Sequence, residues 1–149
     1  MNRNFIFTFI LLATLSTVYA MPHQLRGLIP DICSRNAGEL NLEVSPNPIV
    51  PGSPFTFKIS GKLNADVETG SIFNGVFVDL GLSSGLLATY GEDFCASQSI
   101  SCPISAGVEF STEITETAPD TLPKSFSIGA SIISQKNNFI ACKFIDGSS

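Results

Sequence analysis

The chain has 149 residues, of which 44% are hydrophobic and 14% are charged, and its 13 acidic and 8 basic side chains give a formal net charge of −5. A chain of this length corresponds to one domain. The acidic balance and the lack of a basic cluster argue against nucleic acid as a partner, because binding to phosphates is driven by basic side chains that release counterions.

The first 20 residues are predicted to be a signal peptide. Arg3 supplies a positive start, residues 5–15 form a short apolar stretch, and Ala20 ends the segment at a suitable cleavage position. The interrupting polar residues disfavour a membrane anchor, which needs about 20 apolar residues. We therefore expect a mature domain of residues 21–149 that is secreted or delivered to a lysosome- or vacuole-like lumen.

From residue 39 onward, short runs of alternating apolar and polar residues are separated by turn residues, and no window has helical spacing. Such a pattern predicts an all-β chain folded as a two-sheet antiparallel sandwich. Asn137-Asn138 is expected to form the turn before the last strand. The clearest predicted strands are residues 40–44, 55–60, 72–82, 108–115, 126–132 and 139–145.

Two neighbouring segments leave alternatives open. Residues 72–82 carry Val76 and Val78 on one parity but Phe73 and Phe77 on the other, so this strand is either buried on both sides or an edge covered by a loop. Residues 83–94 lack a clean period of two. We interpret them as a strand that breaks into an apolar loop.

The four cysteines predict two disulfides in an oxidising compartment. Three pairings are possible, but the short interval between Cys95 and Cys102 is easily closed locally, which leaves Cys33 for Cys142. A zinc site requires paired ligands at short spacing, and neither Cys33 nor Cys142 has a close partner. No metal and no cofactor are expected.

Several short motifs occur in a fixed order around these cysteines. They are Cys33 near the mature start, Phe94-Cys95, Cys102-Pro103-Ile104 with Gly107, Leu122-Pro123, and a terminal Ala141-Cys142. In this combination the chain resembles the ML lipid-recognition family, most closely the fungal phosphatidylglycerol/phosphatidylinositol transfer proteins and more distantly the Niemann-Pick type C cholesterol carriers. The resemblance implies an immunoglobulin-like sandwich with a lipid cavity between its sheets, and the disulfides Cys33–Cys142 and Cys95–Cys102. The third, early disulfide of the sterol carriers is missing here.

The alternating apolar positions would pack a solid core in any sandwich, whereas the resemblance implies that they line the cavity. The expected lining residues are Phe55, Phe57, Ile59, Val76, Val78, Phe110, Ile114, Phe126 and Ile128. The expected mouth consists of Leu86, Leu87, Tyr90 and Phe110. The alternative for the mouth residues is a loop that covers an open sheet edge.

We do not expect an enzyme, because the single histidine, His23, lies in the N-terminal tail and no nucleophile motif is present. Glu92 and Asp93 are adjacent, and adjacent side chains on an extended chain point to opposite sides. The expected function is a monomeric carrier that holds a phospholipid or sterol and exchanges it with membranes during transient contact. The alternative is a secreted interaction module or receptor co-factor of the same fold that acts by binding protein.

Overall fold

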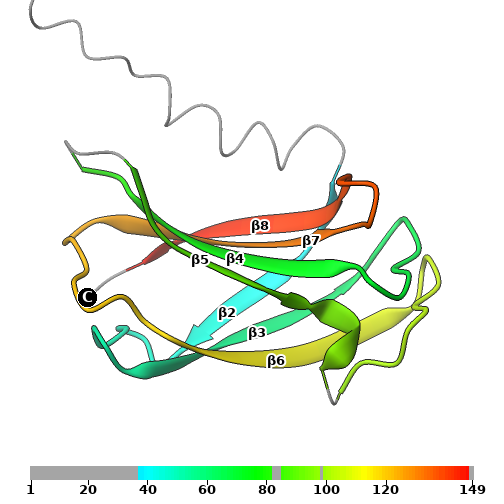
Figure 1. The fold of residues 1–149 in the computed structure, drawn as a ribbon, viewed down its shortest axis with the longest axis horizontal. Coiled ribbons are helices and arrows are strands. Elements are labelled where there is room, and N and C mark those ends of the chain that lie inside the picture. Colours follow the sequence, from blue (N-terminus) through cyan, green and yellow to red (C-terminus); the bar gives the residue numbers. More distant parts are fainter. Residues whose placement is uncertain (1–36, 82–84, 98, 148–149) are drawn as a thin grey trace, which may run out of the picture.

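The structure is a computed structural model, and it describes residues 37–81, 85–97 and 99–147 (Figure 1). The predicted signal peptide, Cys33 and His23 lie outside the described residues. Within the described ranges the chain forms two sheets packed face to face, with a single short 3-10 helix, η1 (Phe94–Ala96). The predicted all-β sandwich is confirmed. No helix in these ranges has the length and hydropathy needed to cross a membrane.

Five strands form the larger sheet and three form the smaller one (Figure 1). All pairs are antiparallel except the first and last strands of the described chain, which run parallel. The larger sheet has the order β1 (Gly38–Glu39), β8 (Phe139–Gly147), β7 (Phe126–Ile133), β4 (Ile72–Asp79) and β5 (Gly85–Asp93). The smaller sheet has the order β2 (Asn41–Ser45), β3 (Pro54–Lys62) and β6 (Glu109–Thr117).

The alternation in the sequence places apolar side chains between the sheets. The buried residues alternate with less buried ones along the middle of both strands, at 55, 57 and 59 in β3 and at 110, 112 and 114 in β6, and the residues between them are polar. The outer face of the smaller sheet is therefore solvated. On that outer face Lys58 Nζ lies 3.6 Å from Glu113 Oε1, and the hydroxyls of Thr56 and Thr115 are 3.0 Å apart. The predicted β7–β8 turn is confirmed, because Asn137 has a φ of 59° and its N–H donates to the Ser134 carbonyl.

β4 places Phe73 and Phe77 in the core cluster, and neither Val76 nor Val78 belongs to that cluster. Phe73 and Phe77 are fully buried, Val78 is 8% exposed, and Val76 is only partly buried. β4 lies between β5 and β7, and the opposite sheet presents aromatic rings to it. The larger aromatic side chains therefore occupy the face toward the opposite sheet, and Val78 is buried on the other face of the strand.

Residues 85–93 form one strand and not a strand that breaks into a loop. The pairing of β5 with β4 shifts register between Phe77 and Val78, so an extra residue is accommodated in β5 at Leu87. This bulge changes which side chains face inward partway along the strand. The absence of a clean period of two in the sequence is a consequence of the bulge.

Candidate functional site

The interior between the two sheets is continuous and apolar. Seven of the nine predicted lining residues are buried in one cluster, and the exceptions are Val76 and Val78. Among the side chains whose burial is described, all buried polar or charged residues are serines or threonines. These buried side chains therefore offer no charge to a ligand. The seven clustered residues are Phe55, Phe57, Ile59, Phe110, Ile114, Phe126 and Ile128.

Aromatic rings from both sheets meet at the centre of this interior. The Phe55 ring contacts those of Phe57, Phe77 and Tyr90 edge to face, at centroid distances of 4.9, 5.3 and 5.7 Å. Phe126 stacks on Phe77 at 5.7 Å. We call these five residues the aromatic cluster. Each ring pair of this kind contributes about 0.5–1.5 kcal/mol beyond the area that it buries.

The sheets approach each other closely where Phe57 lies over Gly75. A Cβ atom at residue 75 would lie 2.8 Å from Cζ of Phe57, which is closer than real Cβ contacts. Glycine therefore allows the Phe57 ring to rest against the β4 backbone. In this conformation the rings of the two sheets fill the space between them.

One edge of the sandwich is joined by a side-chain hydrogen bond. β5 and β6 are edge strands of different sheets, and no ladder in the described residues pairs them. The Tyr90 hydroxyl donates to the Thr117 carbonyl oxygen across this edge, at 2.7 Å. We call this edge the β5–β6 seam. A strand pair held by so few bonds separates at a lower cost than a paired ladder.

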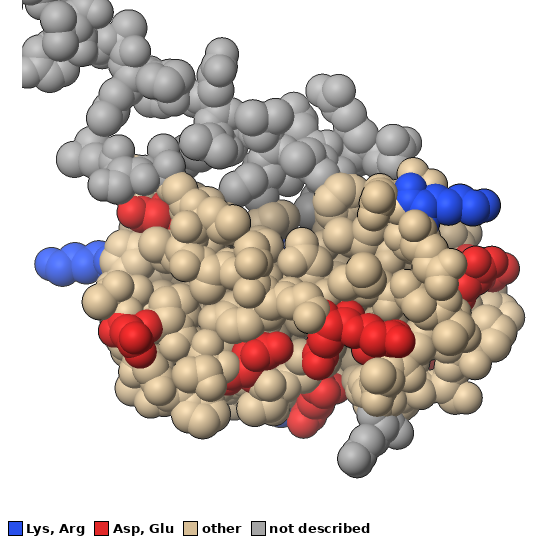
Figure 2. Space-filling view, in the orientation of Figure 1, with Lys and Arg blue, Asp and Glu red and all other residues tan. Residues whose placement is uncertain are grey.

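Acidic side chains lie along the seam. Burial, and then the charge of Glu116, raise the pKa of Tyr90 above its ordinary value of 10.0. Burial, and then the charge of Glu92, raise the pKa of Glu116 above its ordinary value of 4.5. Acidic side chains are scattered over the face that carries β5 and β6, and basic side chains lie only at its margins (Figure 2).

The four predicted mouth residues do not gather at one place. Leu86 and Leu87 lie near the start of β5. Leu86 is 63% exposed and pairs with Val78, and Leu87 packs partly against the core. Tyr90 lies at the seam beside Thr117. Phe110 is buried at the start of β6, where its ring contacts Phe94 at 5.7 Å. The candidates are thus spread along the length of the seam.

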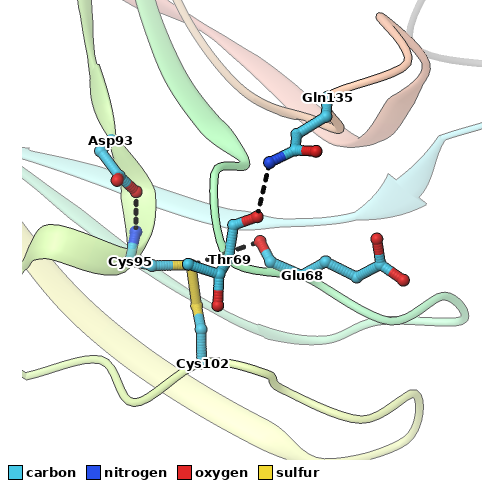
Figure 3. The surroundings of a disulfide bond; sticks show 6 residues. All are labelled: Glu68, Thr69, Asp93, Cys95, Cys102 and Gln135. Atoms are coloured by element: carbon cyan, nitrogen blue, oxygen red, sulfur yellow. Dashed lines mark hydrogen bonds between the residues drawn. A yellow bond between two sulfur atoms is a disulfide. The ribbon is translucent and has the colours of Figure 1, made fainter.

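A disulfide closes the loop between β5 and β6 (Figure 3). Cys95 is bonded to Cys102, as predicted, and the Cys95 N–H donates to Oδ1 of Asp93 at 2.9 Å. The nearby turn is held by Gln135, whose Nε2 donates to the Thr69 carbonyl at 3.0 Å. Cys142 is also disulfide-bonded.

Hydroxyl groups gather beneath this loop, and sequence reasoning did not find them. Oγ1 of Thr112 lies 2.6 Å from Oγ of Ser97 and 2.8 Å from Oγ of Ser99. Ser71 is fully buried, and its Oγ has no hydrogen-bond partner among the described residues. The available signal was Thr112, a polar residue on the apolar parity of its strand.

Comparisons with known proteins agree with this architecture. A sequence model described as the ML domain matches residues 31–147. A Niemann-Pick type C2 protein from Japanese carpenter ant superimposes with a TM-score of 0.61 at 17% identity, covering 78% of this chain and 95% of that one. Chicken MD-1 complexed with lipid IVa superimposes with a TM-score of 0.50 at 16% identity, covering 74% of this chain and 82% of that one. No curated protein sequence matches significantly.

Proposed function

The chain belongs to the ML domain family, and on that premise we propose that it binds a lipid between its two sheets and exchanges it with membranes. The observation that carries the proposal is the uncharged interior, which is lined by aromatic and aliphatic side chains of both sheets and borders the β5–β6 seam. The fold is shared with chicken MD-1, whose structure is a complex with lipid IVa. The likeness supports a lipid as the ligand class.

The energetics favour a ligand whose body is a hydrocarbon chain. Burying about 15 methylenes from water contributes about 12 kcal/mol, at about 0.8 kcal/mol for each methylene. Separating the six ring pairs of the aromatic cluster costs about 3–9 kcal/mol. Burying the hydrocarbon chain of the ligand therefore contributes more free energy than the separation of the ring pairs costs. Relative to a bilayer, which is also apolar, the same burial is close to neutral, and that balance permits exchange in both directions.

The route of uptake in this proposal is the β5–β6 seam. Breaking the bond from Tyr90 to Thr117 frees the edge of β5, where the inner side chains are already partly exposed. A tail that enters there meets Phe55 and Phe77 directly, because both rings contact Tyr90. The acidic surroundings of the seam disfavour long residence on an anionic membrane, so contact with the bilayer is transient.

Native mass spectrometry of the oxidised protein recovered from a secreting host tests the proposal, followed by extraction and identification of any lipid. We expect one phospholipid or sterol for each chain, or stoichiometric uptake from vesicles of mixed phospholipid and sterol. A protein that is recovered unloaded and takes up nothing from such vesicles would contradict lipid binding. Recovery from the medium or from a lysosome- or vacuole-like lumen would identify the compartment.

The filled interior favours a second candidate, which is a secreted module or receptor co-factor that acts by binding protein. In this candidate the rings of the aromatic cluster keep their mutual contacts, and the outer surfaces carry the function. The two candidates differ in one measurable property. Only the carrier takes up stoichiometric lipid in the absence of another protein.

A further inference from the structure

The hydroxyl groups beneath the disulfide loop form a graded path from solvent to the interior. Ser99 is exposed, Ser97 is partly buried, and Thr112 is 2% exposed, and all three hydroxyl oxygens lie within 3.3 Å of one another. A hydroxyl can donate and accept at the same time, so such a group can redirect its protons toward an additional oxygen. We call these three residues, with Ser71, the hydroxyl cluster.

Ser71 lies beside the loop that carries Ser97. The Ser71 carbonyl accepts from the N–H of Phe94, three residues before Ser97. The Phe94 ring contacts that of Phe110, which is two residues before Thr112 on β6. These contacts bring Ser71 to the end of the sandwich that holds the other three hydroxyls.

Ser71 carries a polar atom that nothing in the described residues satisfies. Its Oγ is fully buried and without a hydrogen-bond partner. Buried hydroxyls in folded proteins are nearly always paired, so an unpaired one calls for a partner that binds from outside the chain. The three other hydroxyls bond one another and do not satisfy it.

The chemistry of the hydroxyl cluster selects an uncharged polar group. No Lys, Arg, Asp or Glu among the side chains whose burial is described is buried, so these side chains offer an ionised headgroup at the cluster no partner of opposite charge. The four hydroxyls of the cluster can donate to and accept from an uncharged hydroxyl group of a ligand, because such a group also donates and accepts. The apolar interior continues directly from the cluster, because Ile114 and Phe73 are two residues from Thr112 and Ser71 on the same faces.

We propose that the hydroxyl cluster holds the uncharged hydroxyl end of a long-chain lipid, such as a long-chain alcohol or a monoacylglycerol, while its tail lies among the aromatic side chains. This inference rests on the proposed lipid binding and narrows it to a ligand class. An ionised lipid end is disfavoured in the same position. The hydroxyl of the ligand joins Thr112 and gives Ser71 the partner that it lacks.

The test compares three probes that share a chain of the same length: 1-dodecanol, its methyl ether and laurate at neutral pH. Each displaces a fluorescent fatty probe from the delipidated full-length secreted protein. We expect the alcohol to bind about three- to tenfold more tightly than the ether, the difference that one hydrogen bond makes, and more tightly than laurate. Equal affinity for alcohol and ether, or tighter binding of laurate, would overturn the inference.

Two variants identify the residues responsible. Thr112→Val and Ser71→Ala should each lower the affinity for the alcohol about three- to tenfold and leave that for the ether within about twofold. Ser71→Ala removes a hydroxyl that has no partner, so its melting temperature should not fall. The matched control is Thr115→Val on the outer face of the same strand, with no expected effect on either probe.

The outcomes separate this inference from the function on which it rests. If the wild-type protein takes up none of the three probes and no vesicle lipid, lipid binding itself fails. If the wild-type protein binds all three probes, and Ser71→Ala lowers the affinity for alcohol and ether equally or not at all, lipid binding stands. The proposed role of the hydroxyl cluster is then refuted. Ser71→Ala distinguishes these outcomes even if Thr112→Val fails to fold.

Discussion

Replacing Tyr90 with Phe tests whether one hydrogen bond keeps the β5–β6 seam closed. The change removes the hydroxyl that donates to Thr117 and keeps the ring, whose centroid lies 5.7 Å from that of Phe55 and 5.9 Å from that of Phe77. A neutral hydrogen bond contributes about 0.5–1.5 kcal/mol to the free energy of unfolding. Thr117 is exposed, so water can replace the lost donor. The expected loss is therefore in the lower part of this range, about 0.5–1 kcal/mol, or about 2–4 °C in melting temperature.

The same bond must break before the seam opens, so the variant should load faster. A barrier lowered by about 0.5–1 kcal/mol raises a rate about two- to fivefold. Stopped-flow transfer of a fluorescent phospholipid from neutral vesicles measures this rate, and thermal unfolding followed by circular dichroism measures the stability. We expect Tyr90→Phe to melt slightly earlier and to take up lipid about two to five times faster than the wild type, by the same conversion.

Thr115→Val is the matched control for this experiment. It also removes a side-chain hydrogen bond, the 3.0 Å contact with Thr56, but that contact joins two strands of one sheet on the outer face. A comparable loss of stability with an unchanged uptake rate is expected. The reasoning is refuted if Tyr90→Phe lowers the melting temperature without raising the rate, or if the control accelerates uptake equally.

Three further changes test the packing, the disulfide and the acidic edge. Gly75→Ala should cost about 1–3 kcal/mol, because its methyl group meets the Phe57 ring, and Phe57→Leu in the same chain should recover part of that loss in denaturant titrations; an unaltered midpoint for Gly75→Ala would contradict the close approach. Replacing both Cys95 and Cys102 with Ala should cost about 2–3 kcal/mol, the loop entropy of so short a ring, measured as a lower urea midpoint in the oxidised protein. Glu116→Gln removes a carboxyl whose pKa in the folded protein is raised by burial and by a neighbouring charge. A carboxyl with a raised pKa makes the folded protein less stable as pH rises from the unfolded pKa of 4.5 through the folded pKa. The variant should therefore have a higher melting temperature than the wild type near neutral pH and the same melting temperature at about pH 3. A difference in melting temperature that stays constant over that pH range would refute the raised pKa of Glu116.

The strands were predictable because each carries its own pattern. Alternation in residues 55–60, 108–115 and 126–132 needs only that one face of a strand is buried, and each of these segments lies within an observed strand or overlaps one. The inner face of β4 was not predictable in this way, because both parities of residues 72–78 carry large apolar side chains. The choice is made by the opposite sheet, where Phe57 contacts Phe73 and Phe55 contacts Phe77. A local pattern contains no information about that partner.

In the candidate site too, the apolar residues were predictable from the local pattern and the polar contacts were not. Positions such as Phe57 and Ile114 followed from periodicity alone, since any buried face contains them. The bond from Tyr90 to Thr117 joins residues 27 apart, and the contact between Ser97 and Thr112 joins residues 15 apart. Both depend on how the loop after β5 returns to β6. Sequence reasoning found the disulfide that closes this loop, but not which polar groups the loop brings together.

A filled interior is consistent with the proposed carrier, because an unloaded carrier must also be stable. A void large enough for an acyl chain would forfeit the contacts of every side chain that lines it. The rings of Phe55, Phe57 and Phe77 come from both sheets and contact one another edge to face, so they occupy the same space that a tail would take. Loading then replaces ring contacts with contacts between rings and tail, and the difference in free energy between the two states stays small. A small difference is what exchange with a membrane requires, since a lipid held much more tightly than in the bilayer would never be released.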